Sequence, residues 1–263
     1  MTSVLLGALH DLTRLAVPLS CAGCGLVDVA LCATCAARLA EPARRVEHAA
    51  PRLDRMTETA PWPVWAVTAY TGGMRDLVVA WKDRGRTDLD RPLGAAMVRL
   101  ARSVAHELLA GAPGAPAIWL VPVPSTASAR RRRGREPVVG LARAAGTSLG
   151  RVLSPAPLPG GVRVVRALEH RRRLRAGALD QVGLGSRARG GNLSGAVRVR
   201  RRTPPLHGVA CVLVDDVLTT GATLAECERA LVAAGGTLVA ALVLAATPGP
   251  TSYPPGAPQV NMG

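Results

Sequence analysis

Residues 208–223 constrain the fold of this chain more than any other stretch. A short apolar run, Val-Ala-Cys-Val-Leu-Val, leads into two adjacent carboxylates, and hydroxyl-bearing residues then surround one glycine. This pattern predicts a buried strand over 208–216 followed by a helix over 222–235. Similar runs predict further strands at 63–70, 117–124, 161–168, 195–201 and 237–246, and helices at 73–82, 93–110 and 136–149. The alternation predicts an α/β fold with a mostly parallel sheet flanked by helices.

The two carboxylates, Asp215 and Asp216, are expected at the carboxyl end of their strand, where ligands of α/β sheets collect. The glycine-containing turn after them would offer free N–H groups at a helix N-terminus, which suits a phosphate. A bare phosphate would be repelled by the acids, whereas ribose hydroxyls donate hydrogen bonds to carboxylates. The segment therefore predicts a ribose 5-phosphate site. The alternative is a strand-to-helix turn that is merely capped by threonine.

The formal net charge is +15, and lysine occurs only at position 82. Such a charge favours polyanionic partners, although arginines on a solvated surface explain it equally well. The first 20 residues lack the features of a signal peptide, and no apolar run reaches transmembrane length. We therefore expect a cytoplasmic protein without membrane insertion.

Four of the six cysteines form two Cys-x2-Cys pairs separated by seven residues: Cys21, Cys24, Cys32 and Cys35. Paired thiolates at this spacing predict a structural Zn²⁺ site, with a redox pair or chance clustering as alternatives. The expected organisation is a helix and four-cysteine module in 1–40, a linker in 41–61, an α/β domain in 62–246 and a disordered tail in 247–263.

The sequence VLVDDVLTTGAT resembles the phosphoribosyl pyrophosphate (PRPP) signature of the type I phosphoribosyltransferases. The resemblance implies that fold for residues 62–246, and it implies that Asp215 and Asp216 hold the ribose hydroxyls. It assigns the 5-phosphate to five consecutive residues: Thr219, Thr220, Gly221, Ala222 and Thr223. Members of the hypoxanthine/guanine type carry an aspartate at the position of Thr219, so the threonine argues against that substrate class.

Three further blocks, 69–85, 121–134 and 180–199, resemble the ComF/GntX-like family of type I phosphoribosyltransferase-fold proteins. That family also carries a small zinc-ribbon-like module near its N-terminus. The single lysine, Lys82, lies inside the first block, at a position where the family pattern has a lysine. The chain departs from the pattern at Arg135, Glu136 and Pro137, where the family has an aromatic residue, Asn and Gln.

The resemblance also implies ligands for the pyrophosphate: Lys82, Arg133 and the backbone of Val123, Pro124 and Ser125. An alternative for the run RRRRGR is a solvated basic turn or a nucleic-acid patch. Residues 169–191 are expected to form a mobile hood over the ligand. The contacts expected from the hood region are Gln181, Arg187 and Asn192.

The predicted function is binding of PRPP with Mg²⁺ and transfer of the phosphoribosyl group to an unidentified, nucleobase-like acceptor. In that reaction a nucleophile displaces pyrophosphate at C1 of the ribose, and no residue stands out as the base. The resemblance also suggests a link to DNA uptake, with single-stranded DNA or the competence machinery as partners. The alternative is a non-catalytic accessory protein that senses PRPP or a nucleotide, or handles single-stranded DNA.

Overall fold

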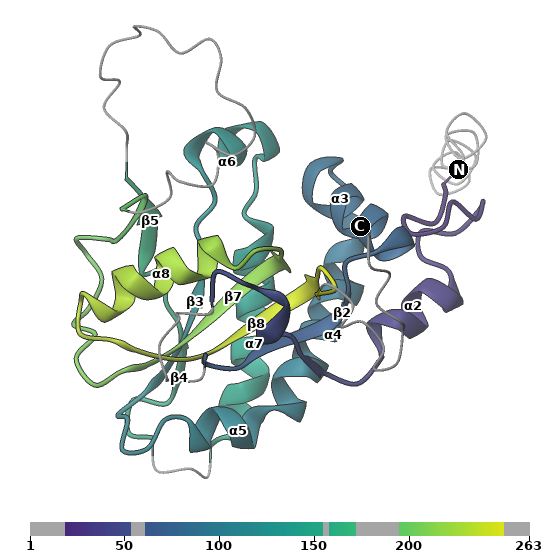
Figure 1. The fold of residues 1–263 in the computed structure, drawn as a ribbon. Helices are drawn as coiled ribbons and strands as arrows, with labels where there is room; N and C mark the ends of the chain where they lie inside the picture. The colour runs from purple at the N-terminus through teal and green to yellow at the C-terminus, as the bar shows by residue number, and fades with distance from the viewer. Residues whose placement is uncertain (1–18, 54–60, 155–157, 172–194, 250–263) are drawn as a thin grey trace, which may run out of the picture.

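A computed structural model describes residues 19–53, 61–154, 158–171 and 195–249 (Figure 1). Its centre is a six-stranded sheet in the order β1-β2-β8-β7-β3-β4. The strands are β1 (Arg44–Arg45), β2 (Val64–Ala69), β3 (Ile118–Pro122), β4 (Val162–Val164), β7 (Ala210–Leu218) and β8 (Thr237–Ala246). Only β1 runs antiparallel to its neighbour; the other neighbouring pairs in this sheet are parallel. The fold is thus a mixed α/β fold with a mostly parallel central sheet, as the sequence predicts.

Helices cover both faces of the sheet (Figure 1). One face packs against α8 (Ala222–Val232), through Leu224, Cys227 and Leu231. The other face packs against α3 (Gly72–Asp83), α4 (Asp90–Ser103), α5 (Ala105–Ala110) and α7 (Pro137–Val152). Two further α-helices of the described part are short, α2 (Ala33–Leu39) and α6 (Ala127–Arg133), and two 3₁₀ helices span Glu47–Ala49 and Thr87–Leu89. Burial on both faces explains why β7 and β8 are continuously apolar rather than alternating.

Two of the predicted elements are each divided in the structure. The helix predicted over 93–110 is two helices, because the chain turns at Val104, whose buried side chain packs in the core. The strand predicted over 161–168 also divides. Its first part is β4, and the chain then leaves the sheet to form β5 (Leu168–His170), which pairs antiparallel with β6 (Val197–Val199).

The segment predicted as a linker contributes to the sheet in its described part. Arg44 and Arg45 pair with β2, and Leu53 is buried beside Gly221, in the turn between β7 and α8. Its remainder, residues 54–60, lies outside the described residues, as does the tail from residue 250 onward.

The cysteine-rich segment lies against α3. The Cβ of an alanine at Gly73, in the first turn of α3, would lie 2.6 Å from the carbonyl oxygen of Gly23. Beyond the other end of α3, the Arg86 guanidinium donates to the carbonyl oxygens of Ser20 (3.0 Å) and Ala30 (3.1 Å). Contacts at both ends of the helix therefore fix the module on α3.

Candidate functional site

The acidic pair lies inside β7, not at its end. The sequence predicts that the strand stops at residue 216, but β7 continues to Leu218 because β8 pairs with it as far as Ala246. On the other side, β3 ends at Pro122 opposite Val214, and the Val123 N–H donates to the Val214 carbonyl (2.9 Å). Beyond that point, among the residues that the structure describes, β7 is paired with a strand on one side only. A pocket occupies the open side.

The pocket has a volume of about 480 Å³. Its walls come from α3, the loop after β3, α6, the start of α7, β5, β7 and the turn into α8. The polar residues that line it are Tyr70, Lys82, Asp83, Ser125, Thr126, Arg133, His170, Asp215, Asp216, Thr219 and Thr223. Of the residues predicted for ribose and pyrophosphate, all seven are in this wall: Asp215, Asp216, Lys82, Val123, Pro124, Ser125 and Arg133.

Asp215 and Asp216 lie on opposite faces of the sheet, since successive side chains of a strand alternate. Asp215 shares its face with Cys211 and Leu213, which pack on α8, and Asp216 shares its face with Val212 and Val214. Burial raises the pKa of Asp215 well above its usual range, and the neighbouring Asp216 carboxylate raises it further. The Asp215 Oδ1 accepts the Asp216 N–H (2.8 Å), which fixes the carboxyl group.

Lys82 forms an ion pair with Asp216 across the pocket. Helix α3 places this lysine by burying Leu77, Val78 and Trp81 on its inner face, so that Lys82 follows at the pocket rim. Its side chain is 29% exposed, whereas that of Asp216 is 3% exposed. The ammonium group therefore pairs with Asp216, one of two adjacent buried carboxyl groups.

The turn from β7 into α8 is tight. Gly221 has φ +80, and a Cβ there would lie 2.7 Å from the Leu53 Cγ, so only glycine fits without strain. Of the predicted phosphate residues, Thr219 and Thr223 line the pocket, whereas Thr220, Gly221 and Ala222 form the turn behind them. The Thr220 hydroxyl accepts the Ala222 N–H (3.4 Å).

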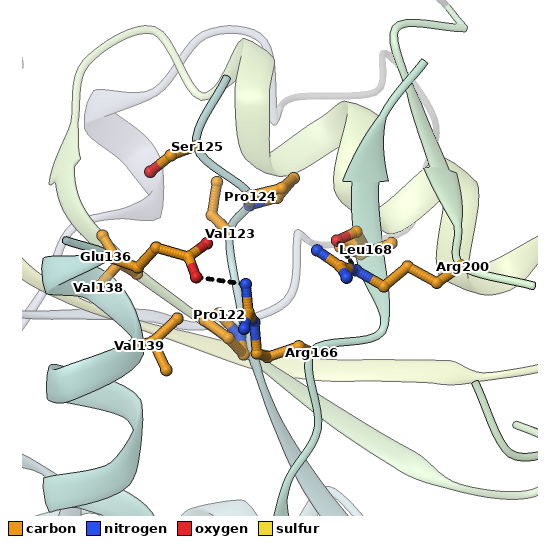
Figure 2. Close-up of a pocket in the computed structure, with 10 residues that line it drawn as sticks. All are labelled: Pro122, Val123, Pro124, Ser125, Glu136, Val138, Val139, Arg166, Leu168 and Arg200. Carbon is orange, nitrogen blue, oxygen red and sulfur yellow. Dashed lines mark hydrogen bonds and ion pairs between the residues drawn. The ribbon is translucent and has the colours of Figure 1, made fainter. Parts of the chain in front are cut away.

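The loop after β3 has most of its backbone groups engaged. The Val123 N–H is bonded to β7, proline has no N–H, and the Arg130 guanidinium donates to the Ser125 carbonyl (2.9 Å). Among Val123, Pro124 and Ser125, the backbone N–H left for a ligand is that of Ser125. A much smaller hollow of about 10 Å³ borders the same loop, and Figure 2 shows the ion pair of Arg166 with Glu136 among the residues that line it.

Arg133 lines the pocket, but its guanidinium is bonded to Asp83, with Nη2 2.9 Å from the carboxylate. The side chain is 11% exposed. A pyrophosphate bound here would compete with Asp83 for the guanidinium.

The residues that depart from the family pattern have contacts of their own. Arg135 donates to Asp90 (2.7 Å) and lies over the Trp81 ring, 5.7 Å from its centroid. Glu136 pairs with Arg166, and Pro137 is the first residue of α7, a position that suits proline. These residues hold α3, α4 and α7 together.

His170 is a pocket residue that no sequence motif selects. It ends β5, and its ring Nε2 lies 2.9 Å from the Pro124 carbonyl oxygen. The contact joins residues 46 positions apart, and no local motif surrounds the histidine. Tyr70 directly follows β2, falls within the family-like block 69–85 and lies in the same wall.

The four cysteines predicted to bind metal lie together: all of their sulfur atoms are within 4.8 Å of one another. A tetrahedral site with Zn–S bonds of about 2.3 Å requires sulfurs about 3.8 Å apart, and the Cys24 and Cys32 sulfurs are 3.6 Å apart. Burial raises the pKa of Cys21, but hydrogen bonds from backbone N–H groups outweigh it and lower that pKa to about 6. The donor set and its spacing fit a metal ion such as Zn²⁺.

Three predicted residues, Gln181, Arg187 and Asn192, lie outside the described residues, as does most of the predicted hood. Strands β5 and β6 flank that segment and lie within the described part.

None of the helices in the described ranges is long and apolar enough to cross a membrane. Comparison with protein-family models and with curated proteins finds no match to this chain.

Proposed function

We propose that the chain binds PRPP, or a closely related ribose phosphate, in the pocket beside β7 and transfers its phosphoribosyl group to an acceptor. The observation that carries the proposal is the convergence of Asp215 and Asp216 with Lys82 and the Thr219–Thr223 turn around one pocket. Acids for hydroxyls, a helix N-terminus for one phosphate and cations for another are the groups that such a ligand needs. We also propose, from the resemblance of residues 69–85, 121–134 and 180–199, that the chain is one of the ComF/GntX-like proteins of the type I phosphoribosyltransferase fold.

The three parts of the ligand would occupy three parts of the wall. Asp215 and Asp216 accept hydrogen bonds from the ribose hydroxyls. Thr219 and Thr223, with the first N–H groups of α8, hold the 5-phosphate. Lys82, Arg133 and the Ser125 N–H hold the pyrophosphate. Binding would then exchange the ion pair of Lys82 with Asp216 for new contacts to the ligand.

Mg²⁺ would accompany the pyrophosphate, because the ion prefers carboxylate and phosphate oxygens and keeps several waters. Asp215 and Asp216 are the carboxylates of the pocket that suit it, since Asp83 is bonded to Arg133. When bound, the ion would neutralise charge on the departing pyrophosphate. Zn²⁺ in the cysteine cluster would instead be structural, since its four thiolates leave no open position.

A dedicated DNA-binding role has less support. Of the arginines around α6, Arg130 donates to the Ser125 carbonyl, Arg132 and Arg133 lie beside Asp83, and Arg135 is bonded to Asp90. Arginines already engaged by carboxylates contribute less to phosphate contacts along a nucleic acid.

Isothermal titration calorimetry with PRPP and Mg²⁺ tests the proposal. The wild-type protein should bind, and the double variant Asp215→Asn/Asp216→Asn should lose about 100-fold or more in affinity, since two hydrogen bonds to carboxylates contribute about 1.5–3 kcal/mol each. Asp76→Asn, an exposed position on α3, is the matched control. Absence of binding by the wild type, or equal binding by the double variant, would refute the site.

A further inference from the structure

We propose that His170 is the proton acceptor of this site, and that the acceptor substrate is a neutral compound whose attacking nitrogen or oxygen carries a hydrogen. The inference rests on the proposed function and extends it to the chemical step and to the class of the second substrate. Its starting point is the hydrogen bond between His170 Nε2 and the Pro124 carbonyl oxygen.

That bond fixes the tautomer of the ring. A carbonyl oxygen can only accept, so Nε2 must carry the hydrogen. In the neutral imidazole, Nδ1 is then the unprotonated nitrogen and can take a proton. A histidine with one ring nitrogen held by a backbone carbonyl is oriented in the way that general bases are.

Several contacts between β6 and α8 fix the position of His170. Opposite it in β6, the Val197 N–H donates to Glu226 (3.1 Å), and the Arg229 guanidinium donates to the Val197 carbonyl (2.9 Å). Glu226 is itself buried and bonded to Arg229. These contacts tie the β5–β6 pair to α8, the same helix whose N-terminus borders the pocket. Helix α8 therefore positions both His170, through the β5–β6 pair, and the turn that is proposed to hold the 5-phosphate.

The other titratable side chains of the described pocket wall are less suited to the task. Asp216 is paired with Lys82, and Asp83 is bonded to Arg133. Asp215 is buried inside β7 and is needed for the ribose. Tyr70 offers a phenol oxygen, which is a hydrogen-bonding group and not a basic nitrogen. In the described wall, His170 is the group with a basic nitrogen and no ion pair.

Atoms and charge balance in the proposed step. The attacking atom of the acceptor forms a bond to C1 of the ribose, and the bond from C1 to the pyrophosphate oxygen breaks with its electron pair on the pyrophosphate. The hydrogen of the attacking atom moves as a proton to Nδ1 of His170. The resulting imidazolium returns the proton to solvent after the products leave.

Azide separates this role from others, because the anion attacks without a proton to lose. Pyrophosphate release from PRPP would be measured with water, lactams and azoles as proton-bearing acceptors, and separately with sodium azide. The proteins would be wild type, His170→Gln and His106→Gln. Glutamine keeps an N–H donor for Pro124 but is not a base, and His106 is an exposed histidine of α5 at the other end of the molecule (Figure 1).

We expect His170→Gln to lose about 100-fold or more with the best proton-bearing acceptor. The same variant should retain its rate with azide and its PRPP affinity within about threefold, and His106→Gln should match wild type. Retained rates with proton-bearing acceptors, an equal loss with azide, or lost PRPP affinity would each overturn the role of His170. A wild-type protein that binds PRPP but releases no pyrophosphate with any nucleophile would overturn it too, while PRPP binding would stand. Absence of PRPP binding would refute the proposed function itself.

Discussion

Asp215→Asn is expected to stabilise the fold while it impairs the site. Burial and the adjacent Asp216 carboxylate raise the pKa of Asp215, so the folded chain holds that proton more tightly than the unfolded chain does. Stability from such a group is complete below the unfolded pKa, about 3.9, and falls as the pH rises through the folded pKa. Asparagine removes this dependence. Its side-chain oxygen can still accept the Asp216 N–H, so the geometry of β7 is preserved.

At pH 7 the variant should be about 1–2 kcal/mol more stable than wild type, a gain within the range of single stabilising substitutions. For a chain of this size that is a rise of about 2–8 °C in Tm. Thermal unfolding would be followed by circular dichroism between pH 3 and 8, with Asp76→Asn as an exposed control. The advantage should shrink as the pH falls and vanish below about 3.9. A variant less stable than wild type at pH 7, or an advantage that grows toward low pH, would refute the reasoning.

Three further variants test individual contacts. Lys82→Met should lower the free energy of unfolding by about 3 kcal/mol, since it leaves the buried Asp216 unpaired. A urea titration measures this loss. Adding Asp216→Asn to the same variant should restore most of the lost stability. Gly221→Ala should lower the stability by about 1–3 kcal/mol in the same assay, because its φ is +80 and the new Cβ would meet Leu53. Gly73→Ala should weaken PRPP binding in calorimetry without removing any pocket group, because it forces the cysteine-rich segment away from α3. Unchanged values in any of these measurements would contradict the corresponding contact.

The central sheet could be predicted from the sequence because strands buried on both faces are apolar without interruption. The end of β7 could not. Polarity changes at Asp215, yet the partner strand β8 stays apolar to Ala246 and continues the pairing to Leu218. The extent of a strand depends on its neighbour, which local pattern does not identify.

Some residues of the candidate site could likewise be predicted from the sequence, and others could not. Asp215, Asp216 and the turn after them lie in one continuous segment, so their chemistry is visible in the sequence. His170 joins the pocket only through a contact with Pro124, 46 residues away, and Arg133 meets Asp83 from a distance of 50 residues. Which side chains share a pocket across such distances is decided by the crossover connections of the sheet, and the sequence pattern carries little information on them.

The cysteine-rich segment lies against α3, and this position connects it to the pocket. It contacts α3 at the first turn, through Gly23 and Gly73, and beyond the last turn, where Arg86 reaches the carbonyl oxygens of Ser20 and Ala30. Lys82 lies between these two points, on the helix that they hold. A metal ion that ties the four cysteines together would therefore also fix Lys82, the residue that pairs with Asp216. Removal of the metal by a chelator should accordingly lower PRPP affinity in calorimetry, with the sheet retained in circular dichroism, because loosening α3 moves the ammonium group and leaves the core of β7 and β8 intact.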